Sequence, residues 1–194
     1  MKQCMIFCLL LINSTFTFAG QMVWNEGSVV LKTKEVLVGE ISIEPEYDLI
    51  LHRSNGKVDV YPAHKIQSIY FYDEEANINR KFISLKEAGL FNHHQLFEIV
   101  LRGEISIYRK QKMGTGKSPS DADGFYYYTY HHNQLIDLFK FRNQVYPQLI
   151  ESAGNRISVY IDKNKLNPNS SADAIKIIEF YNSLERDDQL LAKY

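Results

Sequence analysis

Residues 28–43 carry the pattern that most constrains the fold, a two-residue alternation of apolar and polar side chains on both sides of a short polar run. Val29 and Leu31 alternate before that run, and Leu37 and Ile41 alternate after it. Because successive strand residues point to opposite faces of a sheet, a period of two predicts a β-hairpin. We expect this hairpin to begin the sheet.

Short segments with strand character follow along the chain. Asn55-Gly56 is the preferred pair for a type I′ turn, because both of its positions need positive φ, and Pro62 ends the next strand because it cannot donate to the ladder. Further strands are expected at residues 47–53, 57–61, 66–72, 78–85, 96–101, 104–108, 125–130 and 134–138. Such close spacing predicts a mainly antiparallel small β-barrel or sandwich-like sheet.

After Phe139 the period changes to that of a helix. Pro147 suits the first residue of a helix that reaches Ala153, and Gly154 suits its end. A second helix is expected at residues 156–163, and a third begins at a cap supplied by Ser170 or Ser171. The expected class is therefore α+β, with C-terminal helices packed on the sheet. The domains are residues 1–20 as a signal peptide, 21–138 as a β-rich domain and 139–194 as a helical segment.

A five-residue motif occurs twice, at residues 39–43 and 103–107, and each copy follows an apolar run. This repeat predicts that one strand-entry geometry is used twice. If the repeat is two-fold, Glu40 and Glu104 face each other.

The first twenty residues have the pattern of an export signal. Lys2 precedes an apolar core at residues 5–12, and small residues predict cleavage after Ala19 or Gly20. The core is too short to span a bilayer, and no later stretch is long enough either. We expect an exported protein, in the periplasm or at the cell surface, without a transmembrane segment after cleavage.

Composition excludes several classes of function. The chain has 22 basic and 23 acidic residues, so it lacks the surplus of positive charge that nucleic-acid binding needs. Cys4 and Cys8 are its two cysteines, and both lie in the expected signal. A cysteine nucleophile and a thiolate metal site are therefore not expected.

Several short motifs resemble a group of uncharacterised exported proteins from Bacteroidetes-type bacteria. They are Trp24 with residues 27–31, residues 39–41, Phe97-Glu98 with Gly103 ahead of a strand, and the terminal residues 179–182. The resemblance extends over most of the mature chain. It implies a cell-envelope location and a β-rich fold with terminal helices, and it assigns no activity.

Two histidine pairs are the candidates for a metal site. They are His93-His94 and His131-His132, and Glu98 stands four residues after His94. Imidazole is the commonest metal ligand, but adjacent strand residues point to opposite faces, so each pair can supply two ligands only from a loop. The alternative is that these are solvated turn histidines. No cofactor is expected.

Tyr126, Tyr128 and Tyr130 share one side of an aromatic strand and are the candidate binding residues. Facing water, they would form a strip for a sugar, a peptide or a partner protein. Covered by a helix, they would belong to the core, and the terminal helices need such a surface.

Catalytic motifs are weak, and no catalytic residue is predicted. Residues 114–118 end like a phosphate-binding loop, but Gln111 stands where that motif needs glycine. Strand serines lack a nucleophile elbow, and Glu40, Glu98 and Glu104 alternate with apolar residues as on the wet side of a sheet.

The sequence favours a non-catalytic binding or structural module of the cell envelope, with a glycan or an envelope protein as partner. The alternative is an envelope hydrolase that uses carboxylates or histidines. A third hypothesis, a subunit of an envelope assembly, predicts a large exposed apolar patch.

Overall fold

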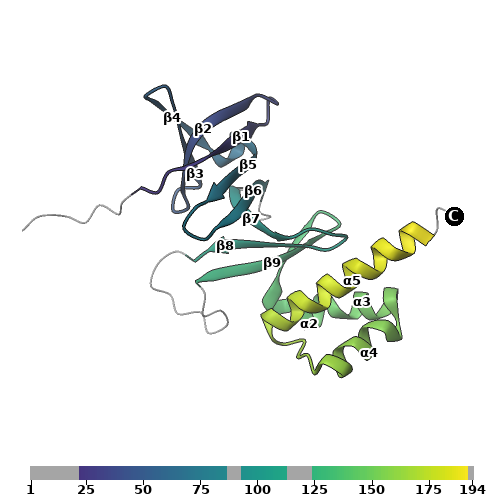
Figure 1. Ribbon diagram of the computed structural model, residues 1–194. Coiled ribbons are helices and arrows are strands. Elements are labelled where there is room, and N and C mark those ends of the chain that lie inside the picture. The colour runs from purple at the N-terminus through teal and green to yellow at the C-terminus, as the bar shows by residue number, and fades with distance from the viewer. Residues whose placement is uncertain (1–21, 87–92, 113–123, 192–194) are drawn as a thin grey trace, which may run out of the picture.

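The computed structural model describes residues 22–86, 93–112 and 124–191, with side chains described as far as residue 186. The expected signal peptide and the loop at residues 114–118 lie outside the described residues. Within them, an antiparallel sheet is followed by helices, as Figure 1 shows. The predicted α+β class is confirmed.

Ten strands of the described chain form one sheet in the order β10-β9-β8-β7-β6-β5-β1-β2-β3-β4. They are β1 (Asn25–Leu31), β2 (Val36–Glu44), β3 (Leu49–Ser54), β4 (Lys57–Pro62), β5 (Ile66–Asp73), β6 (Ile78–Lys86), β7 (His94–Leu101), β8 (Ser106–Gln111), β9 (Phe125–His131) and β10 (Gln134–Asp137). Since β10 and β4 are its edges, the sheet is open and not closed into a barrel.

Turn chemistry produces the predicted hairpins. The expected first hairpin is β1 paired with β2. Asn55 and Gly56 join β3 to β4 with φ of 50° and 76°, as a type I′ turn requires, and β4 ends at Pro62.

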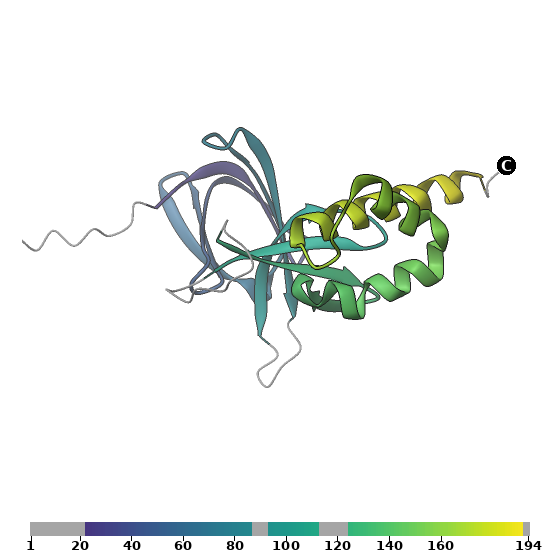
Figure 2. The same cartoon turned by 90° about the horizontal axis from the view of Figure 1, so that it is seen from below.

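The sheet curls at its N-terminal end, where the early strands curve around one another (Figure 2). One buried apolar cluster contains Ile50 of β3, Ile69 of β5 and Leu96 of β7, although no two of these strands are neighbours in the sheet. Asp48 closes the curl: its side chain accepts a 3.0 Å hydrogen bond from the Leu96 N–H, and its carbonyl accepts one from Ala63. The hydrogen bonds of Asp48 thus hold the curl together, where a closed barrel would have a ladder of hydrogen bonds between two strands.

Two glycines lie opposite each other in the curled region. Gly27 of β1 pairs with Gly39 of β2, and Gly27 also pairs with Phe71 of β5. A Cβ atom at Gly27 would lie 2.6 Å from the Cβ of Phe71, and one at Gly39 would collide with the Arg53 carbonyl. Side chains at these positions would force the strands apart, which explains why glycine is needed here.

The repeated motif does not produce a repeated structure. Gly39 lies inside β2, whereas Gly103 and Glu104 lie in the turn before β8. Asn182 holds the second copy in this conformation: its amide oxygen accepts from the Ile105 N–H at 3.0 Å, and its amide nitrogen donates to the Ile105 carbonyl at 2.8 Å. The expectation that Glu40 faces Glu104 is wrong, because Glu40 pairs with Arg53 and Glu104 contacts His131.

The helices cover only the C-terminal end of the sheet (Figure 1). After β10 come one 3-10 turn, η3 (Leu138–Lys140), one short α-helical turn, α2 (Phe141–Gln144), and three longer helices, α3 (Tyr146–Ala153), α4 (Asn155–Asn164) and α5 (Ser171–Leu191). A further 3-10 turn, η2 (Ala63–Lys65), joins β4 to β5. α3 begins at Tyr146, one residue before the predicted start at Pro147, and Gly154 ends it as predicted. The Ser170 hydroxyl accepts from the Asp173 N–H, as expected of a cap.

A second buried cluster joins these helices to the sheet. Ile177 and Ile178 of α5 pack with Ile107 of β8, and Tyr127 of β9 packs against the same cluster. The predicted packing of helices on the sheet is confirmed for this end. No helix of the described chain is both long enough and apolar enough to cross a membrane.

Candidate functional site

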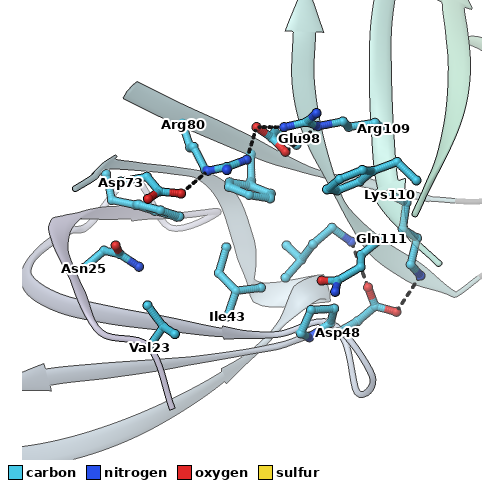
Figure 3. Close-up of a pocket in the computed structure, with 15 residues that line it drawn as sticks. Val23, Asn25, Ile43, Asp48, Asp73, Arg80, Glu98, Arg109, Lys110 and Gln111 are labelled. Atoms are coloured by element: carbon cyan, nitrogen blue, oxygen red, sulfur yellow. Dashed lines mark hydrogen bonds and ion pairs between the residues drawn. The ribbon is translucent and has the colours of Figure 1, made fainter. Parts of the chain in front are cut away.

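A cavity of about 250 Å³ opens between the curled strands and the middle of the sheet (Figure 3). Its apolar lining comes from five different strands and consists of Ile43, Phe71, Phe82, Leu96 and Phe125, with Val23 and Pro45 at the same hollow. The rings of Phe71 and Phe82 stack with centroids 5.6 Å apart. The curl therefore creates an aromatic pocket that no single hairpin contains.

Among the described residues, six charged side chains line the same cavity, three acidic and three basic: Asp48, Asp73, Arg80, Glu98, Arg109 and Lys110. Their formal charges cancel. The sequence pattern placed Glu98 on the wet side of a sheet, whereas the structure gathers it with five other charged side chains.

Glu98 is the centre of the charged lining and is only 7% exposed. Arg80 Nη1 donates to its Oε1 at 2.8 Å, while Arg109 donates to both oxygens, from Nε at 2.7 Å and from Nη2 at 2.9 Å. In the ladder Glu98 lies opposite Phe82 and Arg109, so the three share one face of the sheet. This is the inner face of the curl, which is why the predicted wet position of Glu98 is wrong.

Asp73 extends the network at the end of β5. Its carboxylate accepts from the Ala76 N–H at 3.0 Å and from Arg80 Nε at 2.6 Å. The Ala76 N–H lowers the pKa of Asp73 most, and the Arg80 guanidinium lowers it further against the effect of burial. Asp73 therefore stays ionised at neutral pH. Its stabilising contribution is fully present above the ordinary aspartate pKa and is lost as the pH falls from there through the lowered pKa.

Arg109 is held between a carboxylate and an aromatic ring. Its guanidinium carbon lies 4.2 Å from the centroid of the Phe125 ring. Burial lowers the pKa of Arg109, but hydrogen bonds to Glu98 and Tyr127 outweigh that effect and raise the pKa overall. The side chain is therefore a permanent cation with a fixed orientation.

Asp48 forms the opposite wall of the cavity and is 7% exposed. Lys110 Nζ lies 3.3 Å from its Oδ2, and the Leu96 N–H occupies its Oδ1. Figure 3 shows Gln111 on the same side of the hollow as this carboxylate, and Asn25 on the far side. The polar lining thus combines ion pairs with uncharged amides.

This arrangement favours recognition over proton transfer. A general acid or base must be able to exchange a proton with a substrate. Glu98, Asp73 and Asp48 are each held by at least one cation and, for Asp73 and Asp48, also by a backbone N–H. Fixed dipoles and charges around an apolar pocket suit the binding of a polar ligand in one orientation.

The predicted metal ligands separate into two groups. His93 Nδ1 lies 3.8 Å from Asp48 Oδ2, and burial together with Lys32 and Lys86 lowers the pKa of His94. Glu98, which the sequence associated with His94, is occupied by two arginines instead. His131 and His132, at the other end of the sheet, lie together with Glu104.

The three candidate tyrosines of β9 are half-buried, each against a different neighbour. Tyr128 meets Phe97 edge-on at 5.4 Å, Tyr130 packs on Tyr108 at 5.3 Å, and Lys112 Nζ lies 5.1 Å from the Tyr126 ring centroid. The helical layer packs on Tyr127, which lies between them in the strand.

Sequence reasoning missed Asp48, Asp73, Arg80, Arg109 and Lys110. One signal was present: Glu98 interrupts the apolar run of β7, where a carboxylate needs a cation if that strand is buried on both faces. The partners of Glu98 lie 18 and 11 residues away, so no local motif identified them.

Comparisons with protein-family models, with curated proteins and with solved structures give no match for this chain.

Proposed function

We propose that this protein is an exported, non-catalytic binding module that holds a small uncharged polar molecule, of the size of one sugar ring, in the cavity beside Glu98. The observation that carries the proposal is the combination of an aromatic lining with three acidic and three basic side chains in one hollow of about 250 Å³.

Size and charge narrow the ligand class. Pockets for drug-sized ligands enclose ~300–1,000 Å³, so a hollow below that range suits a single ring or a comparably small molecule. Because the formal charges of the lining cancel, a ligand with a large net charge gains no attraction there. A sugar ring has an apolar C–H face for Phe82 or Phe125 and hydroxyls that pair with carboxylates and guanidinium groups.

The hydrolase alternative is less well supported. Hydrolysis by two carboxylates needs one that carries a proton. Asp73 has a lowered pKa, and Glu98 accepts three hydrogen bonds from two arginines. Neither is suited to donate a proton to a leaving group.

A ligand-detected NMR experiment tests the binding proposal. Neutral monosaccharides such as glucose and N-acetylglucosamine are the probes, with neutral amino acids as the competing class. Phe125→Leu removes the ring beneath Arg109, and we expect it to weaken sugar binding by at least tenfold. The matched control is Tyr126→Leu at the next position of β9, which we expect to change affinity less than twofold.

Two results would reject this assignment: no sugar binds, or Tyr126→Leu weakens binding as much as Phe125→Leu does. Preferential binding of neutral amino acids would keep the cavity as the site but reject the sugar as its ligand.

Export is part of the proposal and rests on residues 1–20 of the sequence. Intact mass measurement of the chain recovered from an envelope fraction tests it. We expect a mass that corresponds to cleavage after Ala19 or Gly20. Recovery of the full-length mass from the cytoplasm alone would reject export.

A further inference from the structure

A cluster of three metal-ligating side chains lies away from the cavity, at the opposite end of the sheet. Glu104, His131 and His132 each offer one ligand atom, and these atoms lie within 4.8 Å of one another. His131 Nε2 is 3.2 Å from Glu104 Oε1. No part of the proposed ligand cavity contributes to this cluster.

The turn after β9 explains why two adjacent histidines converge. His131 is the last residue of β9 and pairs with Gln134 of β10. His132 and Asn133 form the turn between them, with φ of 47° and 61°. A regular strand would direct the two imidazoles to opposite faces, whereas this turn brings their centroids to 3.7 Å.

The ladder between β8 and β9 supplies the third ligand. Ser106 pairs with Tyr130, so the turn before β8 lies beside the turn after β9. Glu104 stands in that first turn and is exposed, and its carboxylate reaches His131. Asn182 fixes the same turn through its two hydrogen bonds to Ile105. The carboxylate is therefore presented by backbone that is held in place.

The surroundings favour a cation. A hollow of about 440 Å³ at this cluster is also lined by Glu151 of α3 and Glu185 of α5, and its described lining contains no lysine or arginine. Three carboxylates within one hollow create a negative potential that attracts a divalent ion. The buried Tyr181, whose hydroxyl contacts the Ser152 hydroxyl, forms the inner wall of this hollow.

We propose that Glu104, His131 and His132 bind one late first-row divalent cation, for which Zn²⁺ is the probe. In tetrahedral zinc sites with bonds of about 2.0–2.1 Å, neighbouring ligand atoms lie about 3.3 Å apart. The distance between His131 and Glu104 already matches that spacing, and a small side-chain rotation of His132 completes the set. Water takes the fourth position.

The bound ion would join the turn before β8 to the turn after β9, close to the point where α5 docks. The described residues contain no cysteine, so no disulfide supplies such a link there. An ion that binds the folded chain and not the unfolded chain raises the unfolding temperature. We therefore expect Zn²⁺ to raise Tm by several degrees.

Isothermal titration of the tag-free chain with Zn²⁺ tests the proposal. We expect one ion per chain with a micromolar or lower Kd. His131→Ala/His132→Ala should weaken binding at least fiftyfold, and Glu104→Gln should weaken it about tenfold. The matched control, His93→Ala/His94→Ala, removes the same number of imidazoles and should change Kd less than twofold.

Unchanged Zn²⁺ affinity in His131→Ala/His132→Ala would overturn the proposal, as would an equal loss in the control. If the double variant unfolds, His132→Ala alone decides, because His132 is exposed and its removal leaves no cavity in the core. Affinity within twofold of the unaltered chain in that variant would also overturn it. Failure of sugar binding has no bearing on these outcomes, since the two sites share no residue.

Discussion

Replacing Glu98 with alanine is expected to lower the free energy of unfolding by about 3–4 kcal/mol, because removing one partner of a buried ion pair leaves an uncompensated charge. The Glu98 side chain is 9% exposed, and those of Arg80 and Arg109 are 19% and 20% exposed. Arg80 keeps Asp73 as a partner, so most of the cost arises at Arg109, whose carboxylate partner is Glu98. Urea denaturation measures the change.

Glu40→Ala is the matched control, since Glu40 also forms a two-bonded pair with an arginine. That pair is on the surface, with side chains 42% and 37% exposed, and exposed pairs contribute little. We expect Glu40→Ala to change stability far less than Glu98→Ala. Equal and small effects of the two substitutions would contradict the view that the cavity network is structural.

The contact between α5 and the turn before β8 is expected to show strong coupling between Gly103 and Asn182. Asn182→Ala removes two hydrogen bonds to Ile105 and should cost about 2 kcal/mol. Gly103→Ala should cost about 2 kcal/mol for a different reason, because its new Cβ would overlap the Asn182 amide. Since Asn182→Ala removes the group that Gly103→Ala collides with, the double variant should lose clearly less than the sum.

A double-mutant cycle by urea denaturation measures this coupling, with Asn143→Ala on the exposed side of α2 as the control. Additive losses at Gly103 and Asn182 would show that the Asn182 side chain does not lie against the backbone at Gly103, and would contradict the account of how the helices dock.

Most strands and helices could be predicted because their signals are local. Asn55-Gly56 requires positive φ at both positions, and Pro147 and Gly154 mark the two ends of α3 without reference to any distant residue. The open sheet could not be predicted, because closure depends on Asp48, which contacts Leu96 from 48 residues away. The repeated motif misled for a similar reason, since the second copy is hydrogen-bonded at Ile105 by Asn182, which is 77 residues away.

The candidate sites depend on which faces of the sheet come together, and the alternation of apolar and polar residues along a strand does not predict this. Periodicity correctly places Glu98 on one face of β7, but it does not say that this face lines the inside of a curl. Similarly, the His131-His132 pair could be selected from the sequence, whereas its neighbour Glu104 depends on the register between β8 and β9.

The central claim is that the cavity beside Glu98 holds a small uncharged ring. The most direct measurement is a crystal structure of the chain grown with the monosaccharide that binds most tightly in solution. The account predicts density for one ring within hydrogen-bonding distance of Glu98, Asp73 or their arginine partners. A ring bound instead on the strand side that carries Tyr126, Tyr128 and Tyr130, with the cavity filled only by water, would contradict it.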